Sequence, residues 1–273
     1  MCEPSTDPVR ATGLERGVQF IKREGRFDLN RPPGHSRART IFTLNSGYPA
    51  TIRGRTITEP LRNALDEKRV RILNGVLVFR LLVIDGRLVG AVGLHEKTAQ
   101  IIRLHSSGLI LAGGGGGGLF DRNTNPADLT GDSYALALEA GCMLRDMEFV
   151  QFFPCMHKSS PRLVITSPTL SCGGVLRNKN GDRFMDRYDP ERMEMATRDL
   201  VSQAIYREIK EGRGEDDCVY LDLTSIPSEL FSLRFSDLIN IFSKQGVDLR
   251  KQWIKVTPSA HFFMGGCVAV SYT

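Results

Sequence analysis

Runs of apolar residues broken by turn residues predict a three-stranded antiparallel meander in the first half of the chain. Residues 76–84 and 87–94 are rich in β-branched side chains and are joined by Asp85-Gly86. An Asp-Gly dipeptide between two such runs favours a tight β-hairpin. A third apolar run at 100–104 follows, so we expect three consecutive strands rather than a repeated strand–helix–strand pattern.

Apolar residues at helical spacing predict several helices, and shorter apolar runs predict strands. Helices are expected at 58–69 (with Pro60 in the first turn), 134–139, 197–210 and 230–245. Buried strands are expected at 109–112 and 219–223, and a second hairpin is expected within 175–185, around Asn180-Gly181. Strands and helices are mixed along the chain, which indicates an α/β protein.

Six consecutive glycines, Gly113 to Gly118, lie between the expected strand at 109–112 and the expected helix at 134–139. A strand, a glycine loop and a helix let backbone N–H groups approach a phosphate with no Cβ in the way. No Gly-Lys-Ser/Thr follows, so a nucleoside-triphosphate loop is not expected. The glycines alone leave open a flexible loop that binds nothing.

Composition narrows the possible partners. The 273 residues carry a net charge of +5 with no basic block, so a nucleic-acid partner is not expected. The six cysteines form no C-x-x-C pair, so we expect no metal site and reduced thiols in a cytoplasmic protein. No apolar run reaches the roughly 18 residues that span a bilayer. Any membrane association is therefore expected to be peripheral, through partner subunits.

Several motifs occur along the chain in a fixed order, and together they resemble one family. They are TNPADLTGDSYALALEAG, RDMEFVQFFP, GGVLRNKNGDRFM, ATRDLVSQAI, VYLDLT and HFFMGG. This order is similar to that in the flavoprotein subunits of succinate dehydrogenase and fumarate reductase, a family that includes L-aspartate oxidase. The GHSRAR segment at 34–39 resembles a segment of the oxidases, and the resemblance covers about residues 17–270.

The resemblance implies FAD as cofactor and a fold in three segments. Residues 1–147 would form part of a Rossmann-like FAD-binding domain that carries the meander. Residues 148–258 would form an α+β capping domain, and 259–273 would return to the FAD-binding domain. The G-x-G-x-x-G start of the family is not found before residue 17, so the chain looks like an internal fragment. The residues expected to face FAD are Gly113, Gly114, Gly115, Gly116 and Asp132.

The resemblance also implies a reaction, in which hydride moves between the flavin and a carbon next to a carboxylate. Arg198 matches the family's proton donor or acceptor, while His261 and Thr166 match residues that bind carboxylates of a small substrate. The structural alternatives are, for Arg198, a salt bridge to Asp199 or to a carboxylate of the cap, for His261 a packed histidine, and for Thr166 an ordinary strand threonine. Arg198, the glycine loop and His261 are expected to face one cavity. The expected partners are a chain supplying the missing flavin-binding half, or electron-transfer subunits.

The sequence departs from the family pattern at five positions. Phe153 stands where a carboxylate-binding histidine is usual, and Ser167 and Leu170 stand where a glutamate and an arginine of the proton relay are expected. Cys172 and Pro32 replace acidic residues. Each charge-assisted contact to a carboxylate contributes roughly 1.5–3 kcal/mol, so a dicarboxylate is expected to bind poorly.

Two hypotheses therefore remain. One is a flavin-dependent enzyme with a less charged substrate. The other is a truncated or degenerate non-catalytic paralogue that acts as a binding or scaffold chain.

Overall fold

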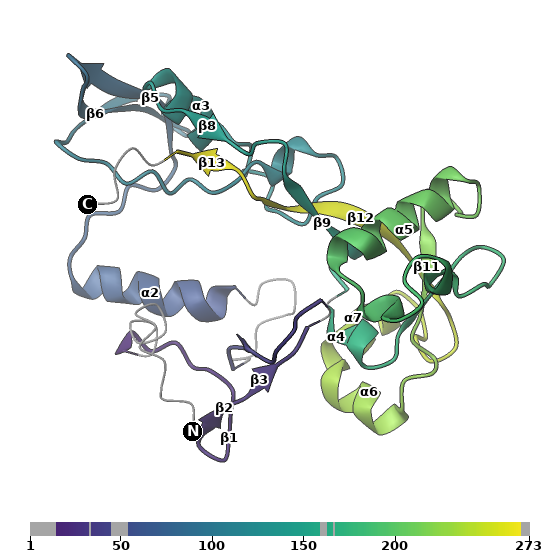
Figure 1. Cartoon of the computed structure of the whole chain (residues 1–273). Helices are drawn as coiled ribbons and strands as arrows, with labels where there is room; N and C mark the ends of the chain where they lie inside the picture. Colours follow the sequence, from purple (N-terminus) through teal and green to yellow (C-terminus); the bar gives the residue numbers. More distant parts are fainter. Residues whose placement is uncertain (1–14, 33, 45–53, 159–162, 166, 269–273) are drawn as a thin grey trace. The chain divides into compact units, whose positions relative to one another are not determined.

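The computed structural model describes residues 15–32, 34–44, 54–158, 163–165 and 167–268. The chain forms two compact units (Figure 1). The first unit consists of residues 1–71 and 157–257, and the second unit consists of residues 72–156 and 258–273. Strands β9 (Val150–His157) and β12 (Ile254–Phe263) each contain a point where the chain passes from one unit to the other.

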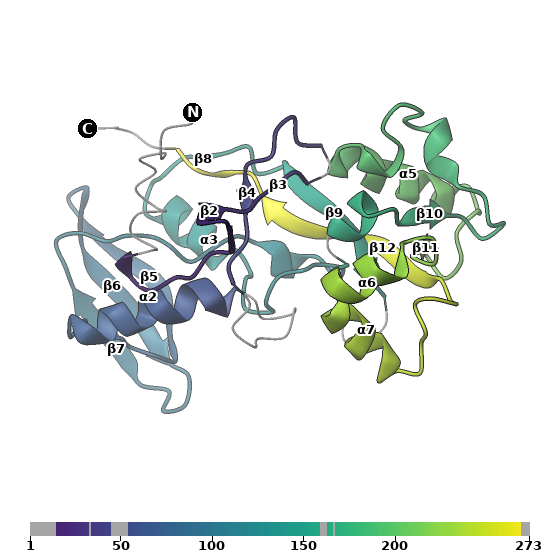
Figure 2. The ribbon, with the colours of Figure 1, turned by 90° about the horizontal axis from the view of Figure 1, so that it is seen from below.

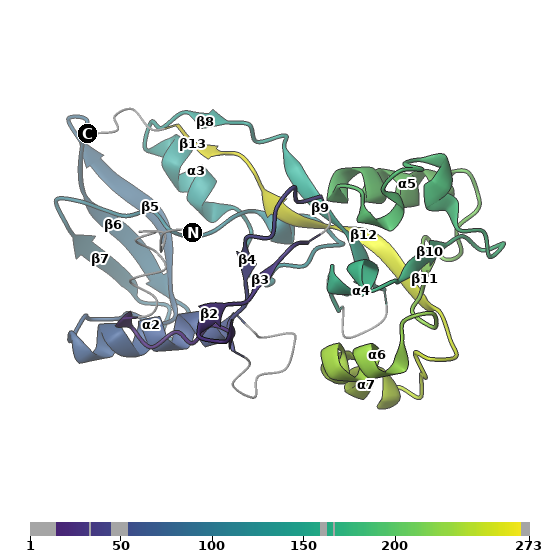
Figure 3. The same ribbon diagram turned by 60° about the horizontal axis from the view of Figure 1, so that its bottom comes forward.

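The second unit contains the expected meander, which confirms that prediction. Its strands are β5 (Val76–Ile84), β6 (Arg87–His95) and β7 (Ile101–His105), in the order β5-β6-β7 (Figure 3). Asp85 and Gly86 form the first turn with φ of 49° and 71°. Two successive positive φ angles match the twist of the strands and explain why an Asp-Gly pair stands there.

Helix α3 (Asp132–Glu139) of the second unit forms where a helix was expected, and it packs against β5. The strand expected at 109–112 does not form, so that prediction was wrong: these residues are irregular, and the Ile110 side chain is 93% exposed. An apolar run becomes a strand only when a neighbouring strand satisfies its backbone, and no described strand pairs with it. The remaining strands of this unit are β8 (Leu144–Arg145) and β13 (Gly266–Cys267), which pair with each other.

The first unit is built around β10 (Val175–Arg177), β11 (Val219–Asp222) and the start of β12, in a four-stranded sheet of order β10-β11-β12-β9. Helix α5 (Arg198–Lys210) lies on one side of these strands, and α6 (Ser228–Arg234) and α7 (Ser236–Ser243) lie on the other side (Figure 2). The expected helix at 197–210 and strand at 219–223 are confirmed. The helix expected over 230–245 is two helices.

The other elements of the first unit are short, apart from α2. They are β1 (Lys22–Arg23), β2 (Arg26–Phe27), β3 (Leu29–Asn30), β4 (Thr40–Ile41), α2 (Arg55–Glu67) and α4 (Pro168–Ser171). Helix α2 begins three residues before the predicted start. Pro60 is therefore its sixth residue and not part of the first turn, which corrects the prediction.

The turn at Asn180-Gly181 forms, but the second strand of the predicted hairpin does not. Strand β10 pairs with β11, and the returning chain makes only a single bridge, between Arg177 and Arg183. A 3₁₀ helix at Phe184–Arg187 follows, because the Phe184 and Met185 side chains are completely buried in the core of the unit. The local turn signal was therefore right, while tertiary packing replaced the predicted second strand.

The buried carboxylate of Glu208 on α5 links three parts of the first unit through hydrogen bonds with Asn178, Tyr188 and Arg213. It is completely buried and accepts two hydrogen bonds of 2.8 Å from Arg213, one of 3.1 Å from Asn178 and one of 2.8 Å from Tyr188. Burial raises the pKa of Glu208, but these hydrogen bonds and the nearby Arg187 outweigh burial and bring the pKa to about 2. The carboxylate is therefore charged and fully satisfied.

Within the described part of the chain, no helix is both long enough and apolar enough to cross a membrane.

Candidate functional site

The glycine run in the second unit changes from exposed to buried along its length. Gly113 and Gly114 are exposed, Gly115 is half-buried, and Gly116 and Gly117 are buried. Among the described residues, no hydrogen bond is found for the N–H groups of Gly113 to Gly116. Backbone N–H groups of this kind are suited to bind an anionic group such as a phosphate.

The same run is held in place by close contacts that only glycine allows. A Cβ on Gly113 would overlap the Ser133 hydroxyl, and one on Gly117 would overlap the side-chain amide of Asn125. At Gly115 a Cβ would meet its nearest atoms at 3.6 and 3.7 Å, which is ordinary contact. Part of the run is therefore glycine for packing within the protein, independently of any ligand.

Asp132 is the first residue of α3, directly after Gly131, which has a φ of 84°. It is exposed, and its carboxylate accepts a hydrogen bond of 2.5 Å from the Thr130 hydroxyl. A carboxylate at this position is favourable for the helix dipole, so Asp132 has a structural role in addition to the predicted contact with FAD. That contact stays a prediction.

His261 lies on β12 in the second unit and is half-buried. Its Nδ1 is 2.6 Å from the Thr124 Oγ1, and its backbone carbonyl accepts a hydrogen bond of 3.0 Å from the Asn125 Nδ2. The ring is thus attached to the segment that directly follows the glycine run. Asn125 links the two features, because it also occupies the space above Gly117.

Aromatic rings lie beside the imidazole of His261. The Phe153 ring is centred 5.3 Å from it and the Phe262 ring 4.1 Å from it. Phe153 is only 3% exposed, so the residue that stands in place of the family's histidine is a packed apolar neighbour of His261. With phenylalanine in place of histidine at position 153, the surroundings of His261 are less polar than the family pattern would make them.

Arg198 is the first residue of α5 in the first unit and is half-buried. Burial lowers the pKa of its guanidinium below the usual value. Thr197, immediately before it, packs against Gly34, and the Gly34 N–H donates a hydrogen bond of 3.3 Å to the Met195 carbonyl. The GHSRAR segment therefore lies at the start of the helix that carries Arg198.

The stretch 166–172 holds one predicted substrate contact, Thr166, and three positions where the sequence departs from the family pattern. Thr166 lies outside the described residues, so its role stays a prediction. Ser167 precedes α4, and Leu170 within α4 is 7% exposed in an apolar core. A buried leucine cannot take the place of a relay arginine. Cys172 ends α4 and is half-buried.

The structure brings the glycine run, Asp132 and His261 into one unit and assigns Arg198 to the other. A cavity shared by all of them stays a prediction.

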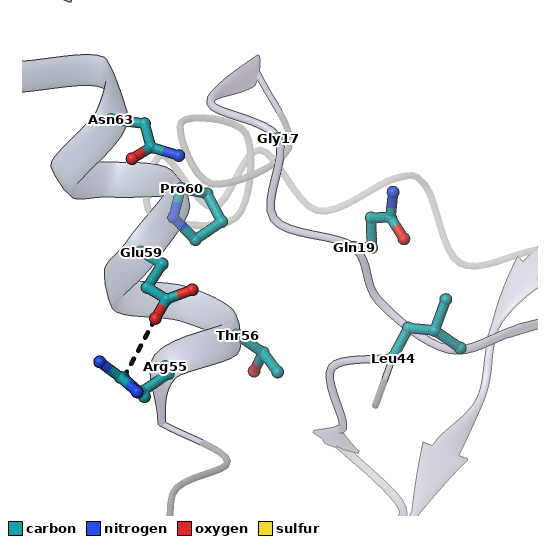
Figure 4. A pocket seen from close by; sticks show the side chains of 8 residues that line it. All are labelled: Gly17, Gln19, Leu44, Arg55, Thr56, Glu59, Pro60 and Asn63. Atoms are coloured by element: carbon teal, nitrogen blue, oxygen red, sulfur yellow. Dashed lines mark ion pairs between the residues drawn. The ribbon is translucent and has the colours of Figure 1, made fainter. Parts of the chain in front are cut away.

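A pocket of about 190 Å³ lies in the first unit between α2 and the chain near residue 17 (Figure 4). Its lining residues are Gly17, Gln19, Leu44, Arg55, Thr56, Glu59, Pro60 and Asn63. An ion pair of 3.0 Å joins Arg55 and Glu59 along the helix, and Asn63 and Pro60 face the turn at Gly17. None of the residues predicted to bind cofactor or substrate lines this pocket.

Sequence reasoning missed Thr124 and Asn125 as partners of His261. They are separated from it by 137 and 136 residues. Both lie in the TNP motif that pointed to the family, so motif membership was the available signal. Nothing in the local spacing indicates which distant residue they contact.

Known proteins resemble this chain over nearly its whole length. A family model described as "FAD binding domain" matches residues 8–270. An FAD-dependent oxidoreductase of Methanocaldococcus jannaschii is 39% identical over 262 residues, which are 95% of this chain and 47% of the relative. One of the subunits of the CoM/CoB fumarate reductase of Methanothermobacter marburgensis is 36% identical over 264 residues, with coverage of 95% and 47%. Bacterial L-aspartate oxidases are also among the relatives.

A solved structure of a mutant E. coli quinol fumarate reductase matches with a TM-score of 0.84 and 29% identity, over 95% of this chain and 46% of that chain. The α/β fold and the resemblance predicted from the motifs are therefore confirmed. The chain spans about half the length of the curated relatives it matches. The family model and the flavoprotein relatives indicate FAD as the cofactor. The N–H groups of Gly113 to Gly116, which have no hydrogen-bond partner among the described residues, fit an anionic part of that group.

Proposed function

Because this chain belongs to the FAD binding domain family, we propose that it forms part of an FAD-dependent oxidoreductase. The observation that carries the proposal is the glycine run, whose N–H groups at Gly113 to Gly116 have no hydrogen-bond partner among the described residues. In this proposal residues 1–147 and 259–273 belong to the flavin-binding domain, and residues 148–258 form the cap. FAD, when bound, supplies the hydride chemistry.

The protein residues then bind the substrate and move a proton. His261 binds a carboxylate of the substrate, Thr166 binds another oxygen, and Arg198 gives or takes the proton on the carbon next to the one that exchanges hydride. An arginine is a poor acid because it normally stays protonated. Burial of Arg198 lowers the pKa of its guanidinium, which makes release of a proton less costly.

The substrate is a small carboxylate with less negative charge than a C4 dicarboxylate. Phe153 supports this inference. It is buried beside His261 at the position where the family usually has a histidine that binds a carboxylate of the substrate. A phenylalanine ring offers that carboxylate neither a charge nor a hydrogen bond. Leu170 supports the same inference, because a buried leucine stands where the family has an arginine of the proton relay.

The same two residues favour a second candidate function, a non-catalytic paralogue that binds but does not turn over substrate.

The proposed partners are other chains of the same enzyme. The curated relatives are about twice as long as this chain, and one of them is named as belonging to a fumarate reductase of several subunits. In this proposal the partners are a chain that contributes to the flavin-binding half, or electron-transfer subunits. Membrane association would run through such subunits.

Flavin binding is the first test. The purified chain is incubated with FAD, alone and with a candidate partner chain, desalted, and examined for the visible flavin band. A retained band supports the proposal. A preparation that stays colourless under both conditions would falsify it.

Variants of α5 separate the two candidate functions. Arg198→Gln is expected to keep FAD binding and to lower turnover with a carboxylate substrate by at least about 10²-fold, the size usual for a lost acid or base. Arg207→Gln is the matched control, because Arg207 is an exposed arginine of the same helix. Equal activity in the two variants would contradict the role of Arg198, and a wild-type chain that binds FAD without turnover would favour the non-catalytic candidate.

A further inference from the structure

The meander of the second unit has one face that is open to solvent, and the register of its strands defines this face. Side chains two residues apart along a strand lie on the same face of a sheet, and so do cross-strand partners. Along β7, the residues at 101, 103 and 105 are exposed, whereas those at 102 and 104 are half-buried. The open face of the meander therefore consists of the exposed residues of β7 and their partners on β6 and β5. Its members are Ile101, Arg103 and His105 on β7, Leu94, Val92 and Gly90 on β6, and Leu77, Arg80 and Leu82 on β5.

The open face has more apolar side chains than a solvated sheet face normally carries. Leu77 is 49% exposed and Ile101 is 67% exposed, and both lie in one row across the sheet with the half-buried Leu94. An antiparallel sheet with one solvated face usually alternates apolar and polar residues, whereas strands covered on both faces are apolar almost throughout. Strand β5, with the sequence VLVFRLLVI, has the second pattern. An exposed apolar face of this kind is typical of a protein interface.

Two arginines lie in the next row of the same face. Arg80 and Arg103 are exposed and lie on either side of Val92, because a register shift in β5 between Val78 and Arg80 keeps Arg80 on this face. Neighbouring strands are about 4.8 Å apart, so the two arginines start from backbone positions about 10 Å apart. Within the described part of the chain neither arginine forms an ion pair, and no Asp or Glu belongs to the open face.

These two rows determine the chemistry of a partner. Apolar side chains would cover Leu77 and Ile101, and carboxylates would pair with Arg80 and Arg103, since charges across an interface are complementary. A second copy of the chain that docked through the same face would bring arginines against arginines, which costs free energy. Membrane-binding surfaces commonly have clusters of about four to eight Lys or Arg, more than the open face offers. A polypeptide with apolar and acidic residues fits both rows.

We propose that the open face of the meander binds an acidic polypeptide segment. Its apolar side chains pack on the row of Leu77, Leu94 and Ile101, and its carboxylates pair with Arg80 and Arg103. The chemistry of this segment follows from the described residues of the second unit. Only its assignment to another chain of the enzyme rests on the function proposed above.

Two synthetic peptides test the proposal on the full chain. Both form an amphipathic helix with a leucine face, and one carries glutamate at the flanking positions where the other carries lysine. Binding is measured by the fluorescence anisotropy of the labelled peptides. The glutamate peptide is expected to bind, with an affinity that falls as the salt concentration rises, and the lysine peptide is expected not to bind.

Variants of the open face show whether the binding occurs there. The double variant Arg80→Gln, Arg103→Gln is expected to weaken binding of the glutamate peptide about tenfold. Ile101→Thr keeps a β-branched side chain and is expected to weaken binding about fivefold. Arg207→Gln is the matched control, because it removes an exposed arginine of the first unit, and no change is expected.

Charge reversal separates a lost contact from a lost fold. The double variant Arg80→Glu, Arg103→Glu is expected to bind the lysine peptide more tightly than the glutamate peptide, a gain that an unfolded chain would not show. No binding of the glutamate peptide by the wild-type chain, equal binding of both peptides, or binding that the arginine variants leave unchanged overturns the inference.

Other occupants of the face give distinct results. Binding to phosphatidylglycerol vesicles that the arginine variants abolish, without peptide binding, would assign the face to a membrane and overturn the inference. A dimer seen by light scattering that Ile101→Thr dissociates would assign the face to a second copy and overturn it as well. A chain that binds the glutamate peptide but not FAD would overturn the proposed function and leave this inference standing.

Discussion

Glu208 in the first unit and His261 in the second unit are both held by hydrogen bonds, but in opposite ways. Glu208 is completely buried and charged, and it accepts hydrogen bonds from Arg213, Asn178 and Tyr188. His261 is half-buried, its Nδ1 lies 2.6 Å from the Thr124 Oγ1, and aromatic rings lie beside its imidazole.

The difference teaches how to separate a structural polar group from one suited to bind a ligand. A buried charge whose partners fill its hydrogen-bonding capacity stabilises the fold and has nothing left for a ligand. A half-buried group such as His261 keeps part of its surface accessible, so it can also contact a ligand. His261 lies in the HFFMGG motif and Glu208 lies on the helix that carries ATRDLVSQAI, so a position in or beside a motif does not tell them apart.

The largest effect is expected for Glu208→Gln, which keeps the shape of the side chain and removes its charge. Arg213 would then lose its main counter-charge, and the free energy of unfolding is expected to fall by about 3 kcal/mol. Trp253 is the single tryptophan of the chain and lies in the first unit, so urea unfolding followed by its fluorescence measures this change. The control is Glu211→Gln, whose exposed carboxylate also pairs with Arg213; a change below about 1 kcal/mol is expected there.

The same carboxylate predicts a pH dependence. Its pKa is about 2 in the folded chain against an ordinary value of 4.5, so its stabilising contribution is complete above about pH 4.5 and is lost as the pH falls toward 2. The contribution is about 3 kcal/mol by linkage. Urea unfolding at several pH values should show a flatter acid limb in Glu208→Gln than in wild type. The pKa of Asp222 is also lowered, so Asp222 contributes to the pH dependence of both proteins equally. An acid limb of the same steepness in wild type and Glu208→Gln would contradict the assignment to Glu208.

In the second unit, the two parts of the glycine run should respond differently to alanine. Gly117→Ala places a methyl group on the Asn125 side chain and is expected to cost about 1–3 kcal/mol of stability. Gly115→Ala meets only ordinary contacts and is expected to change stability by less than about 0.5 kcal/mol. Thermal unfolding followed by circular dichroism compares the two. If they lose equal stability, the packing explanation for Gly117 is wrong.

A small effect on stability is also expected for Asp132→Asn. The exposed carboxylate at the start of α3 contributes about 0.5 kcal/mol through the helix dipole. If Asp132 also faces FAD, the variant binds FAD more weakly while its unfolding curve barely moves. Titration with FAD, side by side with urea unfolding, separates these contributions, and unchanged FAD affinity would remove Asp132 from the predicted cofactor contacts.

Local signals in the sequence predicted those elements whose stability is mostly local. The Asp85-Gly86 hairpin and helix α5 formed as expected, since turn geometry and helical periodicity act over a few residues. The apolar run at 109–112 and the second strand after Asn180-Gly181 did not form, because a strand needs a distant partner that local sequence does not name.

The sequence by itself determined the family, the meander, the helices and the candidate residues Arg198 and His261, because motif order and periodicity are properties of the chain. Only the tertiary structure decided which of these residues have partners. It joined Thr124 to His261 across 137 residues, surrounded Glu208 with donors, and placed Phe153 against the imidazole. The physical reason is that a hydrogen bond or a ring contact depends on distance in space, and the fold brings together residues far apart in the chain.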